Sequence, residues 1–162
     1  VNGDVVLRGD PEHAGIQYRP HNDVSVNKSA MYTFPKDGID PLKDKDLPWV
    51  TLTYQLDDKT YSVQHMRHPD NPSDSVYSAY RNYGRFGNYF VKPIADGETL
   101  TLKYRFRITE GEAPSREQLN AQYQAFVKCR ALSRARASAA LAPGALPPPI
   151  PFRTVFLSRR SR

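Results

Sequence analysis

The sequence predicts a mainly β protein, an antiparallel β-sandwich followed by one C-terminal amphipathic helix. Three observations lead to this fold class: apolar and polar residues alternate along several short segments, Asp, Gly, Pro and Asn separate these segments, and a helical pattern occurs only late in the chain. With 162 residues, 25% charged and 11% aromatic, the chain suits one domain with an appendage and is not a fully disordered protein.

Four short segments are candidate strands, because each is rich in apolar and aromatic residues and is flanked by turn-forming residues. The clearest hairpin lies between them in the middle of the chain. Residues 49–56 alternate Val, Leu and Tyr with Thr and Gln, residues 59–66 form the returning strand, and Asp57-Asp58 is typical of a tight turn. The four short candidates are residues 5–7, 13–19, 30–34 and 85–91.

The longest alternation runs over residues 98–109, where the apolar side chains of every second residue predict a strand with one buried face. A helix is expected from Arg116 to about Val127. Ser115 stands at the N-cap position, and Gln118 three residues later completes a capping-box pattern. The apolar residues that follow at helical spacing predict that this helix packs on the sheet.

The net charge of +6 is unevenly distributed along the chain. Residues 129–162 hold seven Arg and no Lys, Asp or Glu, which leaves residues 1–128 with 16 basic and 17 acidic residues. We therefore expect no nucleic-acid partner for the near-neutral part. The sequence predicts a partial sandwich domain over residues 1–128 and an Ala/Arg/Pro-rich, disordered tail over residues 129–162. Residues 131–141 have the composition to extend the helix.

Several interpretations of the tail stay open: a disordered linker, a proline-rich ligand, an anion-binding tail, or the out-of-frame translation of GC-rich DNA. The chain lacks an initiator Met, so we expect the start of the protein to lie upstream. It has no apolar run of about 18 residues, so no membrane span is expected. With Cys129 alone, neither an internal disulfide nor a multi-Cys metal site can form, and no cofactor is expected. The compartment and the oligomeric state stay open.

The first candidate site lies on residues 13–21. If this segment is a strand, one face carries polar side chains around a glycine that leaves space, which suits hydrogen bonds to a polyhydroxylated or carboxylated ligand. The alternative is an ordinary solvent-exposed strand face. The polar residues of this face are His13, Gln17, Arg19 and His21, with Gly15 between them.

Two further segments carry candidate residues. In residues 65–72, two prolines stiffen a loop that could present His65 or His68 to a ligand or, less favourably, to a metal; Asp70 and Asn71 form side-chain turns there. The alternative is a structural turn. In residues 80–90, aromatic residues and Arg alternate with Gly, which suits stacking on sugar rings, with Arg81 and Tyr83 at the rim. The alternative is a set of core aromatics around a glycine turn.

These segments, in this order, resemble the PmoA-like family of bacterial proteins, which is named after a methane-oxygenase subunit. The resemblance covers residues 3–127 and implies a sandwich similar to galactose mutarotases, of which this chain would be the C-terminal part. Enzymes of that class open a sugar hemiacetal with a His acid and a carboxylate base. The matching motifs are HAGIQYR (13–19), LPWV (47–50), HPDNP (68–72), YGRF (83–86), and LTLKYR (100–105) followed by GE (111–112).

The sequence and the resemblance together predict carbohydrate binding or sugar modification by a small-molecule site on the sandwich. The alternatives are a non-catalytic structural or interaction module and, more weakly, a metal-dependent oxygenase or hydrolase. The expected catalytic residues are His13, His65 and His68, and the expected ligand-binding residues are Gln17, Arg19, His21, Asp70, Asn71, Arg81 and Tyr83. No motif identifies the carboxylate base.

Overall fold

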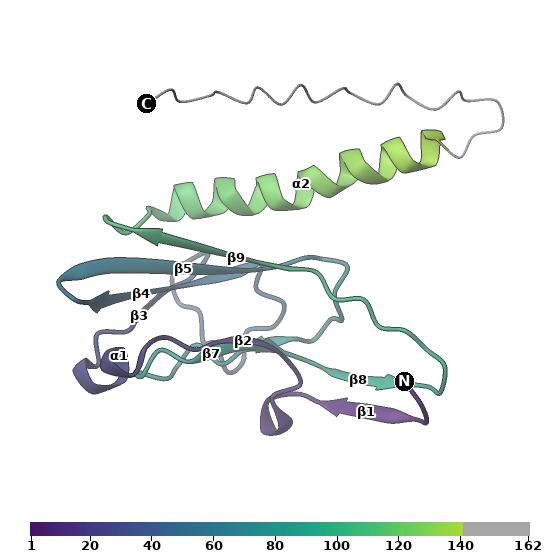
Figure 1. Ribbon diagram of the computed structural model, residues 1–162, viewed down its shortest axis with the longest axis horizontal. Coiled ribbons are helices and arrows are strands. Elements are labelled where there is room, and N and C mark those ends of the chain that lie inside the picture. The colour runs from purple at the N-terminus through teal and green to yellow at the C-terminus, as the bar shows by residue number, and fades with distance from the viewer. Residues whose placement is uncertain (141–162) are drawn as a thin grey trace, which may run out of the picture. The chain divides into compact units, whose positions relative to one another are not determined.

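The computed structural model describes residues 1–140, and residues Val1–Cys129 form one compact unit (Figure 1). This unit is mainly β, with antiparallel sheets, as the sequence predicts. Its strands are β1 (Val5–Arg8), β2 (Gly15–Tyr18), β3 (Met31–Thr33), β4 (Trp49–Leu56), β5 (Lys59–Arg67), β6 (Val76–Tyr77), β7 (Phe86–Tyr89), β8 (Val91–Ile94) and β9 (Tyr104–Glu110). A 3-10 turn at Asp10–Glu12 and the helices α1 (Asn22–Asn27) and α2 (Arg116–Ala140) complete the elements.

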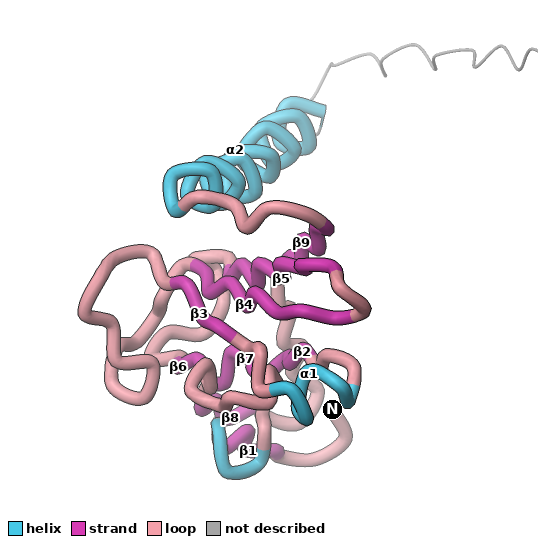
Figure 2. Tube along the Cα trace, turned by 90° about the vertical axis from the view of Figure 1, so that its left-hand side faces the viewer, coloured by secondary structure: helices cyan, strands magenta, loops and turns pink. Residues whose placement is uncertain are grey.

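The strands form a four-stranded sheet in the order β3-β4-β5-β9, a three-stranded sheet in the order β2-β7-β6, and the pair β1-β8. The first two sheets stack as layers (Figure 2), and the beginning of α2 lies on the other side of the four-stranded sheet. The antiparallel β-sandwich is therefore a two-layer arrangement with a helix on one outer face.

The β4–β5 hairpin is buried on both faces. Val50, Leu52 and Val63 belong to the core between the two sheets, whereas Trp49 and Met66, which are paired with each other, face α2. The predicted turn at residues 57–58 has both Asp residues in the left-handed region, at φ 50° and 60°. This backbone matches the strand twist of a two-residue hairpin and keeps the pairing in register.

The predicted strand over residues 98–109 is shorter than expected, because only β9 forms. The chain ahead of it is held at Lys103 by one backbone hydrogen bond, from the His68 N–H to the Lys103 carbonyl over 3.1 Å, and by the side chain of Asn71. The Asn71 amide donates to the Lys103 carbonyl over 2.8 Å, and the Lys103 N–H donates to the Asn71 Oδ1 over 2.7 Å. The Asn71 side chain thus takes the place of a strand residue opposite Lys103, and the pairing with β5 ends at Tyr104, opposite Arg67.

Two other predicted strands also change at their ends. The segment 13–19 is a strand only in β2, because His13 adopts a left-handed conformation with φ 52° that ends the preceding 3-10 turn. The segment 85–91 divides at Phe90, whose N–H donates to the Ala14 carbonyl over 3.2 Å, and the chain then pairs with β1 as β8. Helix α1 was not predicted from the sequence.

Helix α2 begins where the capping box predicts. The Gln118 N–H donates to Ser115 Oγ over 3.2 Å, and the Ser115 N–H donates to Gln118 Oε1 over 2.8 Å. Two side-chain hydrogen bonds fix the helix to the sheet: Trp49 Nε1 donates to Asn120 Oδ1 over 3.0 Å, and Gln64 Nε2 donates to the Leu119 carbonyl over 2.9 Å. The helix continues to Ala140, and the tail predictions for residues 141–162 lie outside the described residues.

The variant Ser115→Ala is expected to lower the free energy of unfolding by about 1 kcal/mol, because the Gln118 N–H loses its side-chain acceptor. Urea unfolding followed by the fluorescence of Trp49, the single buried tryptophan, measures this change. The matched control is Ser73→Ala at an exposed position. A loss in Ser115→Ala no larger than that in the control would contradict the assignment of the cap.

Candidate functional site

Several predicted site residues converge on the outer face of the β2-β7-β6 sheet, the face turned away from the four-stranded sheet. Side chains alternate between the two faces along β7. Phe86 packs in the core between the sheets, so Gly87 and Tyr89 face outward, where they pair with Gln17 and Gly15 of β2. A Cβ on Gly15 would lie 2.0 Å from the Asn88 carbonyl oxygen, so the close approach of the two strands requires this glycine.

Seven side chains cover this face and are called the outer-face cluster below. Tyr89 is fully buried at its centre, and its hydroxyl donates to Gln17 Oε1 over 3.0 Å. The His13 ring lies edge-on to the Tyr89 ring, with 5.6 Å between the centroids. The cluster thus joins β2, β7, the turn before β2 and the loop before β7. Its members are Asp10, His13, Gln17, Tyr80, Arg81, Arg85 and Tyr89.

Charged groups surround the two rings. Arg85 Nη2 donates to His13 Nε2 over 3.2 Å, so the neutral imidazole carries its proton on Nδ1. The Tyr80 hydroxyl donates to Asp10 Oδ2 over 3.4 Å, and Arg81 Nη2 lies 3.9 Å from Asp10 Oδ1. The Arg81 guanidinium also lies over the Tyr80 ring, 4.6 Å from its centroid.

Three charged side chains in the cluster have polar atoms that are buried without a hydrogen-bond partner among the described residues: Asp10 Oδ1, Arg81 Nη1 and Arg85 Nε. A buried polar atom left in this state costs about 1–3 kcal/mol, and more when it belongs to a charged group. Such atoms in native proteins normally have a partner, which can be water or a ligand. The cluster therefore has unused capacity to donate and to accept hydrogen bonds.

The tyrosines of the cluster are hydrogen-bond donors at neutral pH. Burial raises the pKa of Tyr89 above its usual value. Burial and the neighbouring Asp10 carboxylate raise the pKa of Tyr80. Tyr80 is also 44% exposed, so part of its ring is accessible from solvent. The arrangement offers guanidinium and phenol donors, carboxylate and amide acceptors, and one aromatic surface.

Five predicted ligand-binding residues lie outside the cluster, and three of them, Tyr83, Arg19 and His21, are near it in the chain. Tyr83 borders it, with its ring centroid 5.8 Å from the Arg85 guanidinium carbon. Arg19 follows the end of β2 and is exposed. His21 serves as the N-cap of α1, where its Nδ1 accepts a hydrogen bond from the Asp23 N–H over 3.3 Å.

His65, a predicted catalytic acid, is a core residue in this structure. It is completely buried between the two sheets, and neither ring nitrogen has a partner among the described residues. Its ring stacks on Phe106 with 4.3 Å between the centroids, and Tyr77, Tyr104 and Phe86 surround it at 5.2 to 5.9 Å. Burial lowers the pKa of His65 to about 3, so the imidazole is neutral near pH 7 and is not in the imidazolium form that a general acid needs.

The rest of the second predicted segment holds a loop in place. His68 is buried against Phe126 of α2, with 5.6 Å between the rings, and its Nδ1 accepts from the Asp70 N–H over 3.1 Å. Asp70 forms an ion pair with Lys103. Because Asn71 binds the backbone of the same lysine, these contacts match the structural turn that was the alternative interpretation.

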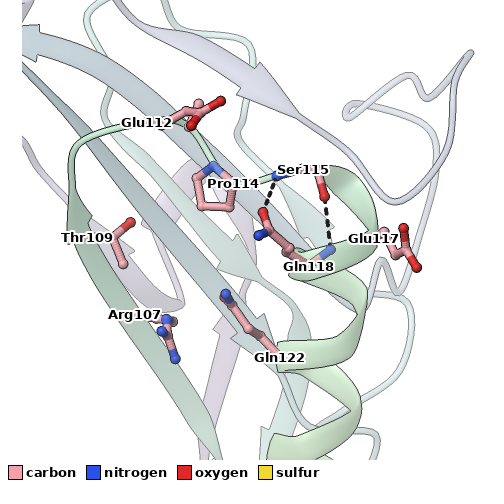
Figure 3. Close-up of a pocket in the computed structure, with 9 residues that line it drawn as sticks. Arg107, Thr109, Glu112, Pro114, Ser115, Glu117, Gln118 and Gln122 are labelled. Atoms are coloured by element: carbon pink, nitrogen blue, oxygen red, sulfur yellow. Dashed lines mark hydrogen bonds between the residues drawn. The ribbon is translucent and has the colours of Figure 1, made fainter.

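A hollow with a volume of about 620 Å³ lies elsewhere, between β9 and the first turns of α2. Figure 3 shows Arg107 and Thr109 of β9 on one side of this groove and Gln118 and Gln122 of α2 on the other. The polar groups at its upper end are already engaged, since Gln118 forms the helix cap with Ser115. The groove brings none of the predicted site residues together.

Sequence reasoning left four cluster members out of the candidate site: Asp10, Tyr80, Arg85 and Tyr89. The sequence feature that could have identified Asp10 is the Gly-Asp-Pro turn at residues 9–11. This turn folds the chain so that the His13 N–H donates to the Asp10 carbonyl over 3.1 Å. The signal for Arg85 and Tyr89 was strand alternation, which places them on the face opposite Phe86.

Within residues 1–140, no group of three or more His, Cys, Asp or Glu side chains is arranged to hold a metal ion. In the same part of the chain, none of the helices combines the length and the apolar character needed to cross a membrane.

The fold and the cluster define a β-sandwich protein with a polar, partly buried surface on one outer sheet face. The chain belongs to the family of unknown function DUF6807, whose model matches residues 1–124. No curated protein and no solved structure matches this chain. The resemblance to the PmoA-like family is therefore wrong, because the family model covers nearly all of the stretch that carried the quoted motifs. The sugar chemistry that this resemblance implied loses its support from family membership.

The variant His65→Leu is expected to reduce the loss of stability on acidification. In the unfolded chain the imidazole takes up a proton below its usual pKa of 6.5, but in the folded chain it does so only near pH 3. Between these values the unfolded state binds more protons, so the free energy of unfolding decreases as the pH is lowered. The contribution of His65 to this fall between pH 6.5 and 5 should be about 1.6 kcal/mol in the parent protein.

Urea unfolding at several pH values between 5 and 7 measures this slope. The control is Val63→Ala, which shortens a buried core side chain that carries no proton and should leave the slope in place. An equal slope in His65→Leu and in the parent protein would show that the buried imidazole does not cause it.

Proposed function

We propose that this protein binds a carbohydrate with the outer-face cluster and does not convert it chemically. The observation that supports this proposal is the presence of three buried, unpartnered polar atoms on Asp10, Arg81 and Arg85. They lie in a cluster that also contains the partly exposed ring of Tyr80.

The chemistry of the cluster fits a polyhydroxylated ligand. Each sugar hydroxyl both donates and accepts a hydrogen bond, so one ligand can satisfy the Asp10 carboxylate and the Arg81 and Arg85 guanidinium groups together. Hydrogen bonds to charged groups are the stronger ones, at about 1.5–3 kcal/mol each. An aromatic ring such as that of Tyr80 offers an apolar surface with a polar tip, which suits the C–H face of a sugar.

Binding without chemistry agrees with the places of the three histidines. His65 is enclosed in the core, and His68 is buried against Phe126 of α2. His13 is the histidine in the cluster, and its Nε2 is engaged by Arg85. The Asp10 carboxylate is held by Tyr80. Acid–base conversion of a sugar needs an acid and a base that are both free to exchange protons with it.

A titration of the ¹⁵N-labelled protein with galactose, glucose and mannose tests the proposal by NMR. At least one sugar is expected to shift amide signals of β2, β7 and the residues around Tyr80. The variants Arg81→Gln and Tyr80→Ala should weaken this binding about tenfold or more, because each removes about 1.4 kcal/mol or more of interaction free energy.

The matched control is Arg107→Gln, which removes an arginine from the other sheet and should leave the sugar affinity unchanged. If sugars bind and shift only signals outside the cluster, or if Arg81→Gln and Tyr80→Ala bind as the parent protein does, the cluster is not the binding site.

A further inference from the structure

Arg85 has no acidic partner near the cluster. Among the described side chains, no carboxylate oxygen lies within 4 Å of its guanidinium nitrogens. Its Nη2 donates to a neutral acceptor, the His13 ring, and its Nε is buried without a partner. A partly buried guanidinium that lacks a counter-charge is costly, because Arg stays protonated at all relevant pH values.

A second arginine, Arg19, directly follows the last paired residue of β2. Tyr18 of β2 pairs with Phe86 of β7, so the same antiparallel register continued by one residue would set Arg19 opposite Arg85. The two chains do stay together beyond the last ladder pair, since a Cβ on Gly84 would lie only 2.9 Å from the Pro20 side chain. Arg19, like Arg85, has no acidic partner within 4 Å among the described side chains.

Like charges at directly opposite positions of an antiparallel pair destabilise it unless an anion lies between them. The two acidic side chains of the 3-10 turn before β2 already have partners. Asp10 interacts with Tyr80 and Arg81, and Glu12 of the same turn forms an ion pair with Arg8 over 3.1 Å. The cluster and its border therefore carry an excess of positive charge that the described residues do not neutralise.

We infer that the sugar bound by the outer-face cluster carries a carboxylate, as a uronic acid does, and that Arg19 and Arg85 hold this group. The inference rests on the proposed function and names the class of sugar. A planar carboxylate matches the fork of a guanidinium, with two parallel hydrogen bonds. The sugar hydroxyls would then form hydrogen bonds with Asp10, Arg81 and Tyr80, which supply both donors and acceptors.

The test compares galacturonate and glucuronate with galactose and glucose, and with acetate as an anion that is not a sugar, in low salt. NMR titration of the full chain gives each affinity. At least one uronate is expected to bind about tenfold or more tightly than its neutral counterpart. The ratio of the affinity for the uronate to that for the neutral sugar should fall towards one in Arg19→Gln and in Arg85→Gln. The ratio should be largely retained in Arg19→Lys, which keeps the charge.

The control Arg107→Gln lowers the total charge equally but should keep the preference for the uronate. The fluorescence of Trp49 and the dispersion of the amide signals confirm that each variant is folded. Should Arg85→Gln fail to fold, the pair Arg19→Gln and Arg19→Lys still gives the comparison, because Arg19 is exposed after the end of β2.

The outcomes separate the two claims. Equal affinity for acidic and neutral sugars, or a preference that both Gln variants retain, overturns the carboxylate assignment and leaves the proposed function standing. Binding of acetate as tight as that of the uronates, with no binding of neutral sugars, supports an anion site and overturns the carbohydrate assignment. Absence of binding by every sugar and by acetate overturns both.

Discussion

The burial of the β4–β5 hairpin on both of its faces is the constraint from which the rest of the structure follows. On one face, the cross-strand pair Leu52 and Val63 packs in the core between the sheets. On the other face, Trp49 and Met66 pack with Leu119 and Phe126 of α2. A shift of the pairing by one residue would exchange these two sets, so the register fixed by the turn at residues 57–58 decides which residues face the other sheet and which face the helix.

That packing also determines where the outer-face cluster lies. Asn88 of β7 points towards the four-stranded sheet, where its amide donates to Ser75 Oγ and its Oδ1 accepts from the Tyr104 hydroxyl. Phe86, two residues earlier, fills the core on the same side. Because strand residues alternate, Tyr89 must then face outward. The long polar side chains of the cluster cover this ring, and their charged ends place guanidinium and carboxylate groups on the surface of the sheet.

The sequence predicted the elements whose signals are local. The hairpin and the capping box at Ser115 depend on residues close together in the chain, and both are confirmed. The site depended on contacts between distant residues. The local sequence around His65 suggested a site, but the side chain is buried against Phe106, which lies 41 positions later in the chain. Conversely, Asp10 and Tyr80 meet across 70 positions, and no spacing rule connects them.

Unpartnered buried atoms occur at His65 and in the cluster, but they have different physical consequences. His65 can stay neutral, since burial lowers the pKa of its imidazole to about 3, and its ring stacks on Phe106 in the core. Arg81 and Arg85 cannot lose their charge, so burial of their N–H groups must be compensated by a partner. Neutrality therefore explains the unpaired ring nitrogens of His65. The core also holds an unpaired guanidinium nitrogen, Nε of Arg67, but that side chain forms an ion pair with Asp46, whereas Arg85 has no carboxylate partner among the described side chains. The anionic sugar proposed above would supply acceptors to both arginines and donors to Asp10 at the same time.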